Sequence, residues 1–203
     1  MTVAIGGKNV ALGALLALVG GILAVVAAFL SWFSFSVTTS GSLSGQSLDG
    51  KIGVDTNSLG GFPGILVLIL GIAAVALAAA WIMQVAMPNV GVPLPAIIAG
   101  VGIVGLVLLG LVYFTNAFAF HWTVTSTGIY KSMPSSTFGT EAPHAAMAEW
   151  SGQVAKFRTE ISSLGSGISF SDSGGAAIGF FGEVLASILV TVGGVLGMSK
   201  KAA

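Results

Sequence analysis

The sequence predicts an all-α membrane protein: a bundle of four transmembrane helices carrying an extracytoplasmic cap, made of a small β-hairpin or sheet and one amphipathic helix. Two observations predict this class. Hydrophobic residues make up 55% of the 203-residue chain and charged residues only 7%, whereas globular proteins carry roughly 25% charge. Four apolar runs also reach the length of about 20 residues that a helix needs to cross a 30 Å hydrocarbon core.

The four predicted spans belong to a single membrane domain that covers residues 1–203. The first run follows Lys8 and could be read as a signal peptide, but its apolar core exceeds the usual length of about 7 to 15 residues, so we expect a retained span. The spans lie near residues 10–33, 62–87, 94–121 and 176–198, and the two long loops cover about 34–61 and 122–175.

Cations beside the spans predict the orientation in the membrane. Lys8 precedes the first span, and Lys200 with Lys201 follows the fourth. Because positive residues favour the cytoplasmic side, we expect a multi-pass plasma-membrane protein with both termini in the cytoplasm. The two long loops then face outward and form the cap.

Small residues recur at three- and four-residue steps in the first and last spans, as in Gly13, Ala17 and Ala24 or Gly179, Gly182 and Ala186. Membrane helices approach one another through such residues. We expect these seams mainly to pack the bundle; a homo-oligomer contact is the alternative.

The first outer loop carries a strand pattern. Phe33, Phe35 and Val37 alternate with small polar residues in WFSFSVTT (32–39), which is the period of a β-strand. Asp49 and Gly50 then stand between short alternating pieces, which predicts a hairpin turn there.

An amphipathic helix is predicted for residues 143–165 of the second loop. Pro143 suits its first turn and Gly165 its end. We expect the apolar stripe along one side of this helix to be covered by the first-loop sheet, by the outer leaflet or by another subunit, and we interpret the stripe as the partner-binding surface. Apolar residues recur at intervals of three and four along one side: Met147, Trp150, Val154, Phe157, Ile161 and Leu164.

Glu183 is the only carboxylate within a predicted span. At 1.5 Å per residue, counting along the helices brings Tyr113 and Asn116 of the third span to a similar height. We therefore predict a hydrogen bond from Tyr113 or Asn116 to Glu183, which either joins helices or serves a proton or cation relay.

The sequence contains little catalytic or ligand-binding machinery. Cysteine is absent and no GxSxG elbow occurs, so thiol and α/β-hydrolase chemistry are excluded and no enzyme activity is expected. His121 and His144 are weak candidates for a copper site or, for His121, a haem or chlorin ligand, and we expect no metal and no cofactor. Without a basic cluster, nucleic acid is not an expected partner.

The segments LLALVGGILAVVAAFLSWFSFS, SGQSLDG and FPGILVLILG resemble small four-span proteins of high-GC Gram-positive bacteria. That resemblance covers about the first ninety residues and implies a plasma-membrane location. The layout of four spans with a strand-bearing first loop is also similar to the claudins and related tetraspans, although the chain lacks their tryptophan-glycine-leucine-tryptophan signature and paired loop cysteines.

These observations favour a non-catalytic membrane subunit or scaffold, in contact with lipid, whose cap binds other membrane or extracytoplasmic proteins. Two alternatives remain open. One is a small proton- or cation-coupled transporter or channel that uses Glu183, and the other is a self-assembling, claudin-like homo-oligomer.

Overall fold

The computed structural model describes residues 2–5, 8–57, 59, 62–84, 91–115, 123–131, 143–163 and 167–199. Of these, 61% are helical and 27% lie in strands. The fold is therefore mixed α/β, and the predicted all-α four-helix class is wrong. The two long loops form much more sheet than expected, because their Ser and Thr residues alternate with apolar residues along strands.

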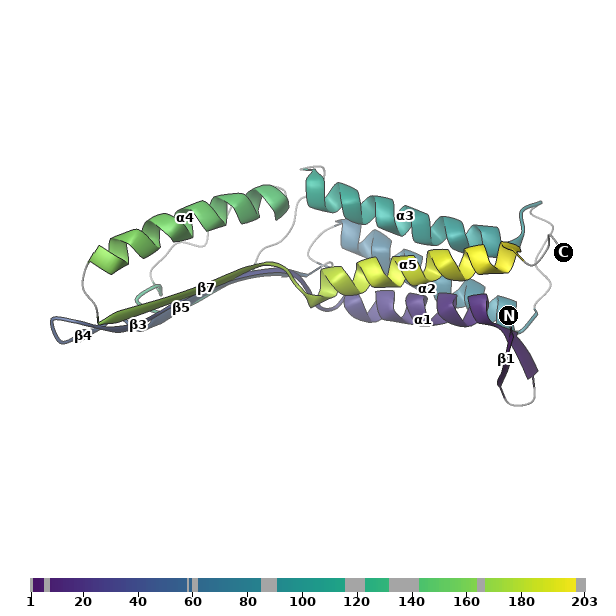
Figure 1. The fold of residues 1–203 in the computed structure, drawn as a ribbon, viewed down its shortest axis with the longest axis horizontal. Coiled ribbons are helices and arrows are strands. Elements are labelled where there is room, and N and C mark those ends of the chain that lie inside the picture. Colours follow the sequence, from purple (N-terminus) through teal and green to yellow (C-terminus); the bar gives the residue numbers. More distant parts are fainter. Residues whose placement is uncertain are drawn as a thin grey trace.

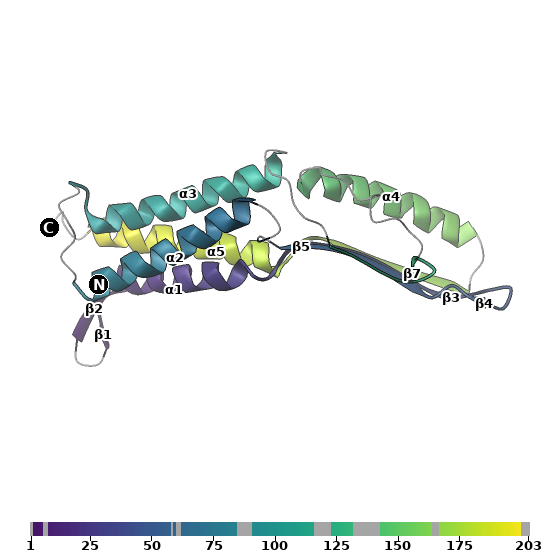
Figure 2. The same ribbon diagram turned by 180° about the vertical axis from the view of Figure 1, so that it is seen from behind.

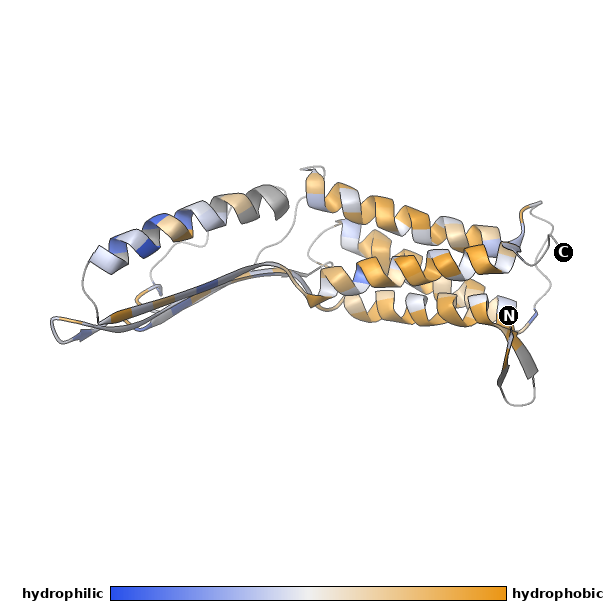
Figure 3. Ribbon diagram, viewed as in Figure 1, coloured by the Kyte–Doolittle hydropathy of each residue, from blue (hydrophilic) through white to orange (hydrophobic). Residues whose placement is uncertain are grey.

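Four helices lie side by side in one half of the molecule: α1 (Leu12–Ala27), α2 (Phe62–Ile82), α3 (Leu94–Phe114) and α5 (Ile178–Met198) (Figures 1 and 2). This half is strongly hydrophobic (Figure 3). Within the described part of the chain, only α2, α3 and α5 are long and apolar enough to cross a membrane. The α1 helix has 16 residues, or about 24 Å at 1.5 Å per residue, so three of the described helices reach spanning length, not the predicted four, and α1 is shorter than its predicted span.

The first apolar run is divided between a helix and a strand. The last turn of α1 closes where the Ala28 N–H donates to the Ala24 oxygen at 3.0 Å. From Ser31 onward, aromatic and β-branched residues alternate with small polar ones and form β3 (Ser31–Leu43). This composition favours a pleated strand over another helical turn, which explains why the helix stops short of residue 33.

Small residues join the helices through α5, which has its most extensive helix contacts with α1 and α3. A Cβ added at Gly193 of α5 would lie 2.8 Å from the Ala17 nitrogen of α1. Such close approach of backbones is the usual packing mode of membrane helices. The predicted small-residue seam therefore serves packing within the chain.

The other half of the molecule is a long antiparallel sheet with α4 (Pro143–Ser163) over one face (Figure 1). β3 pairs with β5 (Gly50–Asn57) on one side and with β7 (Ile168–Ala176) on the other, and β5 also pairs with β6 (Thr123–Gly128). The short β4 (Gln46–Ser47) continues the hairpin at the end of β3. A separate hairpin of β1 (Thr2–Ile5) and β2 (Lys8–Ala11) precedes α1.

The hairpin turn after β3 lies at Ser44 and Gly45, so the predicted turn at Asp49 and Gly50 is wrong. Ser44 has φ 51° and Gly45 φ 82°, and two positive φ values are what a two-residue type I′ turn requires. The Asp49 carboxylate instead accepts hydrogen bonds from the Gly41 N–H at 3.1 Å and from the Ser47 hydroxyl at 2.9 Å.

The sheet continues directly from two of the helices. β3 starts shortly after α1, and β7 ends at Ala176, next to the start of α5. The Ala177 N–H donates to the Trp32 carbonyl oxygen at 2.7 Å, and the fully buried Trp32 donates its indole N–H to the Ala27 oxygen at 3.3 Å. These bonds connect the α1–β3 and β7–α5 junctions to each other.

Candidate functional site

The α4 helix packs on the apolar face of the sheet. The Trp150 ring centroid lies 5.6 Å from that of Phe35, and Val154 is only 7% exposed. Burial of apolar side chains of this size contributes roughly 1.5 to 3 kcal/mol each. The helix and the sheet therefore form a two-layer cap with a small core of its own, in which Val154 lies against Val37, Ile52 and Tyr130.

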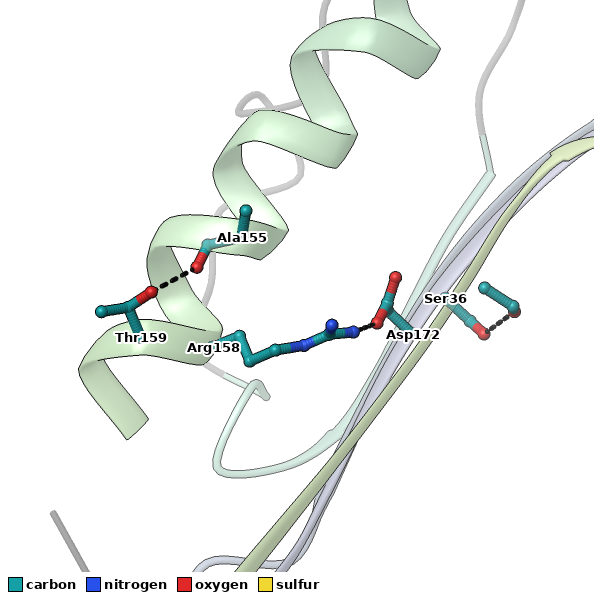
Figure 4. A network of polar contacts seen from close by, with 6 residues as sticks. Ser36, Ala155, Arg158, Thr159 and Asp172 are labelled. Atoms are coloured by element: carbon teal, nitrogen blue, oxygen red, sulfur yellow. Dashed lines mark hydrogen bonds and ion pairs between the residues drawn. The ribbon is translucent and has the colours of Figure 1, made fainter. Parts of the chain in front are cut away.

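A charged side chain also connects the two layers. Arg158 of α4 forms an ion pair with Asp172 of β7 (Figure 4), and its guanidinium lies 5.4 Å from the centroid of the Phe170 ring. Because the Arg158 side chain is 58% exposed, this pair contributes less than about 1 kcal/mol. It therefore adds little to the stability of the cap.

Part of the predicted partner-binding stripe is used inside the protein. Trp150 and Val154 contact the chain's own sheet, which is one of the three coverings expected for the stripe, and partner binding by the stripe stays a prediction. The remaining members lie outside the described side chains: Met147, Phe157 and Ile161, which belong to α4, and Leu164.

The face of the sheet opposite α4 carries hydroxyl groups. Residues that are cross-strand partners share one face of a sheet, and most of the partners on this face are serine or threonine. All of them are exposed or half-buried. We call this surface the hydroxyl face, and it comprises Ser34, Ser36, Thr38, Ser40, Thr123, Thr125, Thr127, Ser169, Ser171 and Ser173.

Hydroxyl groups on this face hydrogen-bond across the strands. The Ser36 and Ser173 oxygens are 2.9 Å apart and those of Ser40 and Ser169 are 2.6 Å apart. Ser36 lies on the far side of the sheet from Arg158 (Figure 4). Lys51 and Asp55 are the charged residues in register with this face among those described, so it is polar but close to neutral.

Tyr130 lies in the cap core and is 3% exposed. Burial raises the pKa of its phenol, because the charged form would lose its hydration, and a hydrogen bond with the Thr39 side chain partly opposes this rise. The phenol is therefore a neutral component of the core at physiological pH.

Glu183 lies near the start of α5 and is fully buried. Neither of its carboxyl oxygens has a hydrogen-bond partner among the described residues. A cavity of about 20 Å³ adjoins it, lined by Ser187 of the same helix and by mostly apolar residues of α1, α2 and α3. Glu183 is thus enclosed by helices and does not face open solvent or lipid.

The predicted hydrogen bond between Tyr113 and Glu183 does not form. Tyr113 packs its ring 5.6 Å from that of Phe180, and since Glu183 has no hydrogen-bond partner in the described structure, the predicted bond from Tyr113 is wrong. Asn116, His121 and the His144 side chain lie outside the described residues. No group of three or more His, Asp or Glu residues that could hold a metal occurs in the described part of the chain.

Comparison with known proteins gives no relative: no family model matches the chain, and neither a curated protein nor a solved structure matches it.

Two features of these sites were missed by sequence reasoning, although the sequence carries a signal for each. TVTST (123–127) and SFSDS (169–173) place hydroxyl residues at every second position, which predicts a strand with one hydroxyl-bearing face. Ser187 follows Glu183 by four residues, so the two side chains share one side of α5.

Proposed function

We propose that this protein is a non-catalytic integral membrane subunit that binds the extracytoplasmic part of another protein through the hydroxyl face of its cap. The observation that carries the proposal is the difference between the two faces of the sheet. One face is covered by α4, whereas the hydroxyl face is exposed or half-buried along β3, β6 and β7.

The composition of the hydroxyl face supports a docking role over simple hydration. Protein surfaces are usually rich in Lys, Arg, Glu and Asp, whereas the charged residues in register with this face among those described are Lys51 and Asp55. Serine and threonine lose little side-chain entropy on contact compared with lysine or glutamate. Each hydroxyl can both donate and accept a hydrogen bond, so the face suits a polar partner of either hydrogen-bonding character.

The candidate membrane helices support the same proposal. Among the described residues, three helices are long and apolar enough to cross a membrane, and the sheet extends from the end of the helices opposite the chain termini (Figure 1). If the termini are cytoplasmic, as the flanking lysines favour, the cap projects from the outer surface of the plasma membrane. A partner would then be another membrane protein or an extracytoplasmic protein.

Site-specific photocrosslinking in native membranes tests the proposal. A photoreactive residue at Ser36, Thr125 or Ser171 should give a discrete adduct with a protein partner, whereas one at Ala155, which is exposed on α4, should not. Equal labelling at Ala155 and at the hydroxyl face, or no adduct at any of the four positions, would reject the hydroxyl face as the docking surface.

The orientation can be tested separately. The chain contains no cysteine, so a single cysteine introduced at Thr125 provides a unique thiol. We expect a membrane-impermeant maleimide to label it in intact cells. Labelling only after lysis would place the cap in the cytoplasm and would contradict the proposed topology.

A further inference from the structure

The surroundings of Glu183 leave a polar group to be accounted for. Buried polar groups in proteins are nearly always hydrogen-bonded, and leaving one without a partner is costly. Glu183 is 0% exposed, and neither carboxyl oxygen has a partner among the described residues. Its lining neighbours other than Ser187 are apolar or glycine.

The cavity beside Glu183 has the size of one water molecule. Its volume is about 20 Å³, and a cavity needs roughly 10 to 15 Å³ of this kind of volume to hold one water. Buried water also needs two or more polar partners. The Glu183 carboxyl and the Ser187 hydroxyl supply them, because both residues line the cavity.

Ser187 is placed for this role by the helix opposite it. A Cβ added at Gly105 of α3 would lie 2.6 Å from the Ser187 hydroxyl oxygen, so glycine at this position leaves room for the hydroxyl. The Ser187 carbonyl oxygen already accepts a hydrogen bond from Thr191 at 2.8 Å. Its hydroxyl is therefore the group on this residue that remains for the cavity.

We propose that Glu183 and Ser187 bind a single internal water molecule, which bridges the carboxyl group and the hydroxyl group inside the helical half of the protein. A metal ion fits less well, because hard cations take six or more oxygen ligands and the side chains lining the cavity offer three. Water donates and accepts hydrogen bonds at once, so one molecule satisfies both side chains. This site is independent of the proposed partner-binding role of the cap.

A high-resolution structure of the purified protein and a set of variants test this site. We expect density for one water within hydrogen-bond distance, about 3.2 Å or less, of both Glu183 and the Ser187 hydroxyl. Glu183→Gln keeps a group that can bind water, so its density should remain. Density showing a direct bond from Glu183 to a protein group, with no water between them, would overturn the proposal.

Thermal unfolding gives a second readout. Ser187→Ala should lower the melting temperature by about 2 to 4 °C, the shift expected for loss of one hydrogen bond in a chain of this size. In the Glu183→Leu background, where a leucine side chain fills the site, the same substitution should have almost no effect, because the two residues act through one water. Equal shifts in both backgrounds would show that no shared water couples the two residues. If Glu183→Leu does not fold, Ser187→Ala is measured in the Glu183→Gln background instead. Its shift should persist there, and the density for the water then decides the proposal.

Discussion

Replacing Gly102 of α3 with alanine tests the close contact between α3 and α5. The new Cβ would overlap the Thr191 hydroxyl and would lie 2.6 Å from the Thr191 nitrogen and 2.7 Å from the Ser187 carbonyl oxygen. Two of these atoms are backbone atoms, which cannot move aside unless α5 shifts. Overpacking of this kind costs about 1 to 3 kcal/mol, and alanine recovers at most about 1 kcal/mol of helix propensity.

We therefore expect Gly102→Ala to lower the free energy of unfolding by about 2 kcal/mol, which corresponds to a melting temperature about 4 to 8 °C lower. Thermal unfolding in detergent, followed by size-exclusion chromatography, measures the shift. Gly100→Ala and Gly110→Ala are matched controls on the same helix, because a Cβ at either position meets no atom within 4 Å. If Gly102→Ala melts at or above the temperature of these controls, α3 and α5 do not approach each other in this way.

Three further predictions concern the cap. Trp150→Ala removes the ring packed on Phe35 and should destabilise the cap by about 3 kcal/mol; limited proteolysis should then cleave the cap faster, and an unchanged rate would contradict the packing. Arg158→Ala breaks an exposed pair with Asp172 and should cost less than about 1 kcal/mol, a difference that should shrink further in high salt. Burial raises the pKa of Tyr130, so the folded cap keeps the phenol proton where the unfolded chain loses it; the contribution of Tyr130 to stability should be constant below about pH 10 and fall above it, and Tyr130→Phe should remove this fall.

Hydropathy located the helices of the membrane half, because burial in lipid demands long apolar runs whatever the tertiary structure. The start of the second helix near Phe62 and of the third near Leu94 follows from this rule. It could not locate the end of α1, because Trp32 and Phe33 are as hydrophobic as a helix in lipid requires yet belong to a strand. Only the alternation with serine distinguishes the two, and that alternation overlaps the end of the apolar run.

The strands of the second loop were harder to predict for a different reason. β7 pairs with β3, more than a hundred residues earlier in the chain, and such pairing depends on the neighbour as much as on local propensity. The sequence of β7 contains glycine at 174 and 175, which weakens a strand considered alone. In the structure Gly174 lies against the Phe35 ring, where a Cβ would be 2.6 Å from a ring carbon, so the glycine makes room for a core side chain.

The candidate sites were also predicted only in part from the sequence. The three-and-four spacing from Met147 to Leu164 predicted an amphipathic helix, and the structure has α4 at Pro143–Ser163. The spacing alone could not state whether Trp150 and Val154 face another chain or their own sheet, because both arrangements bury the same apolar stripe. Likewise, the sequence identified Glu183 as costly in a membrane, but only the packing of four helices around it defines the cavity that it shares with Ser187.

The junction between the sheet and the helices would fix the orientation of any partner that binds the cap. α1 leads into β3 and β7 leads into α5, and the Ala177–Trp32 hydrogen bond joins the two connections. Gly179 of α5 packs here so closely that a Cβ would lie 2.7 Å from the Ser31 carbonyl oxygen. With backbone bonds and a buried tryptophan at its base, the sheet cannot pivot freely on a flexible linker. A protein bound to the hydroxyl face would therefore be held in a fixed orientation relative to α1 and α5, and through them relative to the membrane.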